Sequence, residues 1–133
     1  MKKVEHIGIA VNNLKEANAV FKKILNKEHY KIEEVESEGV CTSFFNVGDI
    51  KIELLEANNA DSPISKFIKK RGEGLHHIAF YVDDLEKEMK RLKESGFELT
   101  QEHYSKGADN KFICFLHPKS THGVLIELCQ EQP

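Results

Sequence analysis

The chain contains few of the residues that characterise collagen-like, disordered and disulfide-rich proteins. Its 133 residues include no Trp, only 3 Pro and only 3 Cys. Few prolines and a hydrophobic content of 40% exclude a collagen-like or disordered chain. The cysteines, Cys41, Cys114 and Cys129, are odd in number and have no CxxC spacing. This pattern is typical of reduced thiols in a cytoplasmic protein and not of a disulfide framework.

Long apolar runs and an excess of one charge are also missing. The longest apolar runs, such as Ile7–Val11, are far shorter than the roughly 20 residues that span a bilayer, and Met1–Lys3 does not lead into an apolar signal region. Nineteen basic and 22 acidic residues give a net charge of −3, with both signs interspersed. We therefore expect neither nucleic acid nor a membrane as a partner, and one cytoplasmic domain over residues 1–133.

The most informative feature that is present is an internal repeat. Two segments share the pattern His-Ile-small-apolar-x-Val-polar-polar-Leu, and aligning His6 with His77 gives an offset of 71 residues. Each copy predicts a strand, a polar pair that can cap a helix, and a helix at about Leu14–Leu25 or Leu85–Ser95. Three strand-like stretches follow each helix: Tyr30–Val35, Val40–Val47 and Ile50–Leu55 in the first copy, and Glu98–His103, Lys111–Leu116 and Val124–Cys129 in the second.

The repeat predicts an α+β fold of two tandem βαβββ modules. The modules cover residues of about 1–56 and 75–133, and a short proline-started helix at about 62–71 links them. A four-stranded module with one helix cannot bury both faces of its sheet alone. We therefore expect the two modules to join into an eight-stranded, partly open barrel with the helices outside.

Four residues of two types occupy matched positions in the repeat. Strand alternation places His6 and His77 on the inner face, and Glu53 and Glu127 are single carboxylates in otherwise apolar strands, 74 residues apart. A pseudo-twofold axis would bring all four toward one point. The sequence therefore predicts one divalent ion per chain, with Co, Mn, Ni, Fe, Zn and Mg as candidates and with open positions for a bidentate oxygen substrate.

These four residues could also have ordinary structural roles. A lone histidine in a strand is more often a core residue, and a lone glutamate more often faces solvent, but four matched positions favour the metal site. His76 should point to the opposite face from His77 and have a structural role. The cations of Lys66–Arg71 form either a solvated helix face or a contact for a phosphorylated ligand.

The chain resembles the methylmalonyl-CoA epimerases of the vicinal oxygen chelate (glyoxalase/bleomycin resistance/dioxygenase) superfamily. The segments that carry this resemblance span nearly the whole chain: His6–Val11, Lys51–Glu56, Asp61–Phe67, Gly72–Phe80, Phe115–Ser120 and Gly123–Leu128. The resemblance implies a metal-dependent 1,1-proton transfer at C2 of methylmalonyl-CoA through a metal-stabilised enediolate. It also implies that Glu127 is both a ligand and a base, and that His117, Lys119 and Ser120 hold the free carboxylate or the thioester end.

The resemblance leaves three points open. Thr42 lies where similar enzymes carry a carboxylate, so the second base is unassigned, with Glu38 or a metal-bound water as candidates. The same ligand set would also serve a glyoxalase I-like lactoylglutathione lyase, and a non-catalytic small-molecule-binding member is a third reading. Exposed strand edges and small size make a homodimer the expected assembly.

Overall fold

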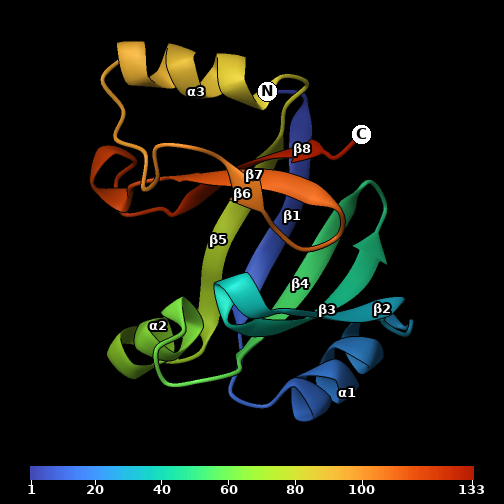
Figure 1. Ribbon diagram of the computed structural model, residues 1–133. Coiled ribbons are helices and arrows are strands. Elements are labelled where there is room, and N and C mark those ends of the chain that lie inside the picture. The colour runs from blue at the N-terminus through green and yellow to red at the C-terminus, as the bar shows by residue number, and fades with distance from the viewer. The chain divides into compact units, whose positions relative to one another are not determined.

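The computed structural model describes residues 1–133 and has two compact units, His6–His76 and Met1–Glu5 with His77–Pro133. Strands and helices follow one another in the order expected from the repeat (Figure 1). The elements are β1 (Lys3–Ala10), α1 (Leu14–Leu25), β2 (Lys31–Val35), η1 (Glu36–Glu38), β3 (Val40–Val47), β4 (Ile50–Ala57), α2 (Pro63–Arg71), β5 (Gly74–Tyr81), α3 (Leu85–Glu94), β6 (Ser105–Lys106), β7 (Lys111–Leu116), η2 (Pro118–Ser120) and β8 (Ile126–Glu131).

In the first unit, β4 lies between β1 and β3, and β2 lies at the outer edge beside β3. β1 and β4 are parallel, while β3 pairs antiparallel with both of its neighbours. α1 packs on one face of these strands, where Leu14 joins the buried side chains of Val11, Phe45 and Leu54. The opposite face of β1 and β4 is therefore the one that carries polar residues of the predicted site.

Both ends of α1 follow from its sequence. The Asn13 side chain accepts a hydrogen bond from the Glu16 N–H at 3.0 Å, and the Glu56 carboxylate on β4 accepts one from the Leu14 N–H at 2.7 Å. Asn26 ends the helix in the left-handed conformation, with φ of 55°. β4 thus fixes the start of the helix that covers it.

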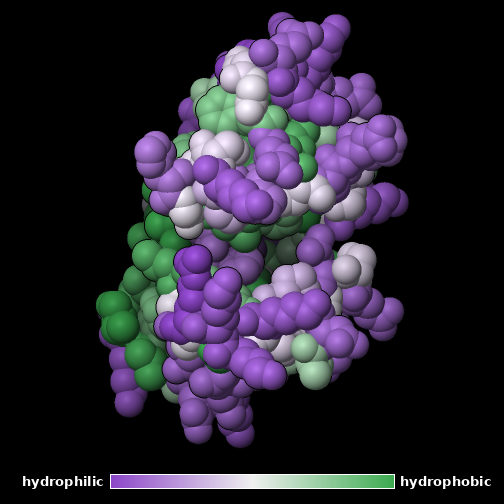
Figure 2. All heavy atoms as spheres, turned by 90° about the vertical axis from the view of Figure 1, so that its left-hand side faces the viewer, coloured by the Kyte–Doolittle hydropathy of each residue, from purple (hydrophilic) through white to green (hydrophobic).

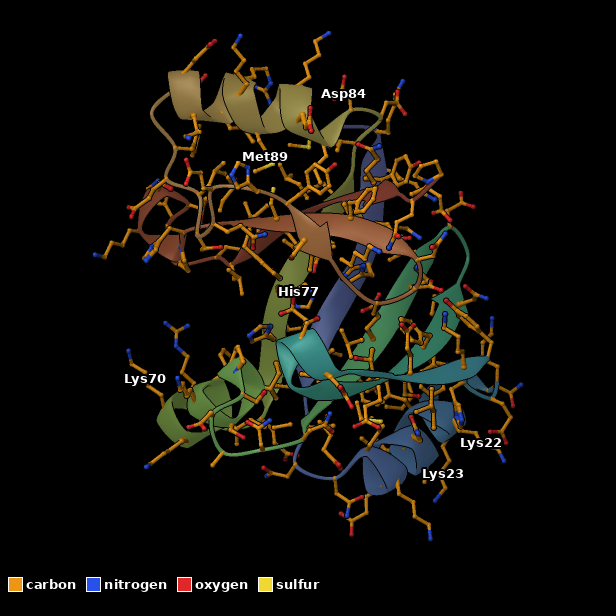
Figure 3. The ribbon with its side chains drawn as sticks, in the orientation of Figure 1. Lys22, Lys23, Lys70, His77, Asp84 and Met89 are labelled. Carbon is orange, nitrogen blue, oxygen red and sulfur yellow. The ribbon has the colours of Figure 1, made fainter.

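The second unit repeats this arrangement. β8 lies between β5 and β7 in the sheet order, with β5 and β8 parallel. α3 turns Leu85, Met89 and Leu92 toward Cys114 and Leu128 of the sheet, and Figure 3 shows Met89 on this inner side and Asp84 at the start of the helix. The outer surface of α3, at the top of Figure 2, is hydrophilic. The helix is therefore amphipathic, as its sequence period predicts.

The start of α3 is stabilised by the same kinds of hydrogen bond as the start of α1. Asp84 accepts from the Lys87 N–H, and the Gln130 side chain on β8 accepts from the Leu85 N–H at 2.7 Å. Gln130 occupies the repeat position of Glu56, and Leu85 that of Leu14. The repeat in the sequence is therefore also a repeat of hydrogen bonds.

The prediction of a continuous strand over Glu98–His103 is wrong. Leu99 forms an isolated bridge with Leu116, and the regular strand is β6, where Ser105 pairs with Ile113. The chain loops out between these two pairings because the Gln101 amide donates to the His103 carbonyl at 2.7 Å and to Ser105 Oγ at 3.2 Å. These local bonds replace the strand ladder there, as in an enlarged β-bulge.

All eight strands form one mixed sheet in the order β2-β3-β4-β1-β5-β8-β7-β6. The α+β class and the two βαβββ modules are therefore confirmed. The helix α2 at Pro63–Arg71 is capped by Ser62, which accepts a hydrogen bond from the Ile64 N–H. The three cysteines are free thiols, as expected. None of the helices has both the length and the apolar composition needed to cross a membrane.

Candidate functional site

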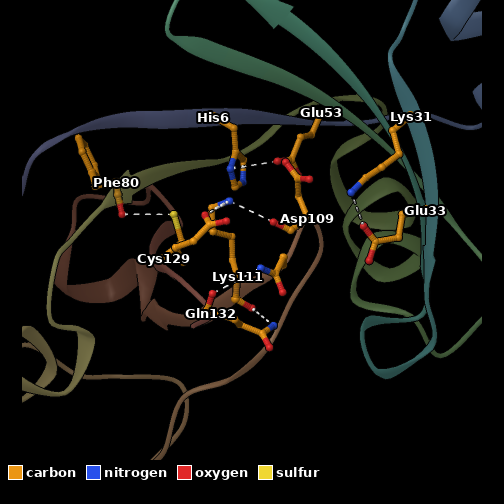
Figure 4. Close-up of polar contacts among 11 residues, drawn as sticks. His6, Lys31, Glu33, Glu53, Phe80, Asp109, Lys111, Cys129 and Gln132 are labelled. Carbon is orange, nitrogen blue, oxygen red and sulfur yellow. Dashed lines mark hydrogen bonds and ion pairs between the residues drawn. The ribbon is translucent and has the colours of Figure 1, made fainter.

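The first unit contains one buried histidine–carboxylate pair. His6 on β1 and Glu53 on β4 lie on the same face of parallel neighbours, and both side chains are 5% exposed. His6 Nδ1 is 3.1 Å from Glu53 Oε2, and Figure 4 shows the two side chains pointing toward one another. The strand register places Phe44 of β3 directly beside Glu53. The pair is therefore buried with an aromatic ring on one side, where an isolated charge would be costly.

The second unit contains the equivalent pair. His77 on β5 and Glu127 on β8 are buried, with His77 Nε2 at 3.4 Å from Glu127 Oε1. Phe115 of β7 is the direct neighbour of Glu127, and its ring meets that of His77 edge-on, with 5.9 Å between centroids. Each unit thus brings together the two donors that the sequence assigns to it.

The donors fit a divalent metal. Each unit offers one imidazole nitrogen and one carboxylate oxygen, a set that borderline divalent ions accept. Buried histidines and carboxylates are rarely left without a counter-charge or an ion, because desolvation costs several kcal/mol for each charge. The chemistry of the two pairs therefore agrees with the predicted ligand set.

The cysteine thiols are poor ligands and nucleophiles. Burial, with a further contribution from the charge of Glu127, raises the pKa of Cys114 to about 12. Burial, together with the charges of Glu56 and Glu34, also raises the pKa of Cys41. Both therefore remain protonated near neutral pH, in agreement with their expected role as small strand residues.

His76 has the structural role expected of it. Its ring meets Phe67 of α2 edge-on at 4.9 Å between centroids, and burial lowers the pKa of His76 to about 4. Arg71 at the end of α2 lies 6.0 Å from the same phenyl ring. His76 is therefore neutral at physiological pH and packs against α2 from the start of β5.

The predicted substrate-binding residues form a compact turn between β7 and β8. His117 Nδ1 accepts from the Lys119 N–H at 3.2 Å, and Ser120 Oγ donates to the His117 carbonyl at 3.0 Å. These bonds shape η2 and lie within the turn itself. Their role in substrate binding stays a prediction.

Two buried polar residues of the first unit are not among the site residues predicted from the sequence. Lys51 is buried on β4, in register with His6. Thr42 is fully buried on β3, and its hydroxyl has no hydrogen-bond partner. The departure of Thr42 from the carboxylate of similar enzymes is a signal in the sequence, but its orphaned hydroxyl is visible only in the structure.

The class of this protein is identified by its match to a known family. Residues 5–115 match the model of the Glyoxalase/Bleomycin resistance protein/Dioxygenase superfamily, and the chain belongs to this superfamily. The resemblance seen in the sequence is therefore confirmed at the level of the superfamily.

Individual members of this superfamily are similar to this protein over nearly the whole chain. Uncharacterized protein YqjC of Bacillus subtilis (strain 168) is 39% identical over 130 residues, which cover 98% of this chain and 93% of that protein. The structure of methylmalonyl-CoA epimerase from Mycobacterium tuberculosis matches with a TM-score of 0.94 at 33% identity, covering 98% of this chain and 89% of that one. A Streptomyces coelicolor methylmalonyl-CoA epimerase variant in complex with 2-nitronate-propionyl-CoA has a TM-score of 0.92 at 31% identity, covering 98% and 95%.

Proposed function

We propose that this protein is a metal-dependent epimerase that interconverts the two C2 epimers of methylmalonyl-CoA. The observation that carries the proposal is the pair of buried histidine–glutamate contacts, at 3.1 Å and 3.4 Å, at repeat-equivalent positions. It is supported by the similarity to methylmalonyl-CoA epimerases along nearly the whole chain. A protein that binds its ligand without a metal would have no need for this donor set.

In this proposal His6, Glu53, His77 and Glu127 hold one divalent ion. His6, Glu53 and His77 are a group of buried donors that could hold a metal. Glu127 joins them because it pairs with His77 as Glu53 pairs with His6. When bound, such an ion would supply Lewis-acid stabilisation of the negative charge that develops on the thioester oxygen as the C2 proton leaves.

Glu127 is the proposed base on one face of C2. Its carboxylate is buried on β8, and the contact with His77 Nε2 orients it. A carboxylate held in this way can accept the C2 proton of one epimer and, in the reverse direction, deliver a proton to that same face, while the proton on the opposite face of C2 must come from a second group.

The turn after β7 is the proposed contact for the acyl end of the substrate. Lys119 and His117 can place cationic or neutral N–H donors near a carboxylate or a thioester oxygen, and Ser120 adds a hydroxyl. The bonds within η2 hold the backbone of this turn in one conformation. A pre-formed turn lowers the entropic cost of binding.

Deuterium exchange at C2 tests the proposal. Metal-loaded protein in heavy water should incorporate deuterium into methylmalonyl-CoA and interconvert its epimers, and a chelator should abolish both. His103→Ala, which removes an exposed histidine outside both pairs, is the control and should keep full activity. Faster isomerisation of the methylglyoxal–glutathione hemithioacetal would instead identify a glyoxalase I-like lyase, and metal-loaded protein inactive toward both substrates would refute catalysis.

A further inference from the structure

Thr42 is a buried hydroxyl that the fold itself does not use. The side chain is fully buried on β3, and Oγ1 has no hydrogen-bond partner. Leaving a buried hydroxyl unpaired costs about 1–3 kcal/mol, so most buried polar groups are paired. A group that binds beside β3 could accept this hydrogen bond and remove the cost.

The hydroxyl lies on the face of the sheet that carries the His6–Glu53 pair. The next residue, Ser43, donates to Asn18 of α1 at 2.6 Å and so faces the helix. Strand alternation turns Thr42 and Phe44 to the other face, where Phe44 is the direct neighbour of Glu53. Thr42 is therefore one step along β3 from the carboxylate pair and on the same side.

The repeat shows that the fold does not require a polar residue here. The equivalent of Thr42 in the second unit is Ile113, which is buried against Ala79 and Cys129. On the β4 side its direct neighbour is apolar, Leu55, and on the β2 side its direct neighbour is Glu33. An isoleucine or valine would fill this position without an orphaned hydroxyl.

The charges around Thr42 indicate what kind of atom its hydroxyl meets. The Nζ atoms of Lys31 and Lys51 lie 5.1 Å and 6.0 Å from the centroid of the Phe44 ring. Glu33, the direct neighbour of Thr42 on β2, forms an ion pair with Lys31 at 3.2 Å (Figure 4). Phe44 is the next residue along β3 on the same face as Thr42, so two ammonium groups lie on this face of the strand, where positive charge favours an anionic oxygen.

We infer that the Thr42 hydroxyl donates a hydrogen bond to a carboxylate oxygen of the bound acyl-CoA, with Lys31 and Lys51 supplying the surrounding positive charge. The inference rests on the proposed function, because it names the residue that orients the substrate at that same site. A threonine hydroxyl is not a base near neutral pH, so Thr42 contributes binding and orientation and not proton transfer.

Thr42→Val tests this inference because it keeps the shape of the side chain and removes the hydroxyl. Binding is measured by calorimetry on metal-loaded protein with malonyl-CoA, which keeps the carboxylate but has no C2 stereocentre to epimerise. The Kd should rise about tenfold or more, as expected for a lost hydrogen bond to a charged group. The thermal midpoint should rise by about 5 °C, because an unpaired buried hydroxyl is removed.

Ser43→Ala is the matched control on the opposite face of β3. It removes a hydroxyl that is bonded to Asn18, so the thermal midpoint should fall while the Kd for malonyl-CoA is unchanged. Thr42→Ser keeps the hydroxyl and should bind close to the wild-type value. Weak binding by Thr42→Ser equal to that of Thr42→Val would overturn the inference, as would wild-type affinity in Thr42→Val.

The outcomes separate this inference from the proposed function. Epimerisation by the wild type with unchanged malonyl-CoA binding in Thr42→Val would leave the function standing and remove the role of Thr42. Binding of malonyl-CoA that depends on Thr42, in a protein that does not exchange the C2 proton, would do the reverse. Failure of the metal-loaded wild type to bind malonyl-CoA would overturn both.

Discussion

The two units of this chain share one arrangement of strands and helices, but the residues around their histidine–glutamate pairs differ. Each places a buried histidine beside a buried glutamate, and each sets a phenylalanine in register with that glutamate, Phe44 with Glu53 and Phe115 with Glu127. The ring nitrogen that faces the carboxylate is Nδ1 in His6 and Nε2 in His77. The arrangement is thus repeated, but the donor geometry is not identical.

The surroundings of the two pairs differ more than the pairs do. On β3 of the first unit, Thr42 adds an unpaired buried hydroxyl, and Lys31 and Lys51 approach the ring of Phe44. On β7 of the second unit, the equivalent of Thr42 is Ile113, in an apolar cluster. If the proposed function holds, such matched pairs with unmatched neighbours would let a symmetric set of donors accept an asymmetric substrate.

The largest expected effect separates the two carboxylates. Glu127→Gln removes the proposed base, and net epimerisation should fall by about 10²–10⁴-fold. Glu53→Gln removes only a ligand charge, so its rate at saturating metal should fall much less. Each epimer is assayed separately for deuterium uptake, with bound metal quantified by mass spectrometry. Near-normal epimerisation by metal-loaded Glu127→Gln would show that this residue is not the base.

The two histidines should contribute alike. His6→Ala and His77→Ala each remove one nitrogen donor, and each should weaken metal affinity by at least about tenfold with the fold retained. Equilibrium dialysis against a metal buffer measures the affinity, and far-ultraviolet circular dichroism checks the fold. A loss in only one of the two variants would break the proposed equivalence of the units, and a wild type that binds no divalent metal would end the hypothesis of a metal site.

Cys114 in the second unit should make stability depend on pH. Burial raises its pKa from 9.0 to about 12, so between these values the unfolded thiol loses its proton while the folded thiol keeps it. Stability should therefore fall as pH rises above about 9, by up to about 1.4 kcal/mol for each pH unit. Urea unfolding of the wild type at pH 8 and 10 measures this, and a pH dependence unchanged in Cys114→Ala would contradict the assignment.

The smallest expected effect concerns the two strand-to-helix hydrogen bonds. Glu56→Ala removes the acceptor for the Leu14 N–H and Gln130→Ala that for the Leu85 N–H, each at a cost of about 1 kcal/mol. Glu56→Ala should cost somewhat more, because its negative charge also faces the positive end of α1. Thermal unfolding of the two variants compares them, and a larger loss in Gln130→Ala would reverse the expected order.

Most of the fold could be predicted because the repeat doubles each weak signal. A single strand histidine has several explanations, but His6 and His77 at matched positions, each with its own glutamate, have fewer. The loop-out between Leu99 and Ser105 could not be predicted, because it depends on bonds from Gln101 that compete with the strand ladder. The burial of Lys51 and the unpaired state of Thr42 likewise depend on tertiary packing.

The loop-out before β6 also has a consequence for how the chain can tolerate changes in length. Leu99 and Ser105 are both anchored to β7, at Leu116 and Ile113, and the extra residues between them leave the ladder. Insertions or deletions in this segment change the size of the loop without shifting the register in which Phe115 meets Glu127. The chain can therefore be lengthened in this segment of the second unit without shifting Glu127, the proposed base, relative to β7.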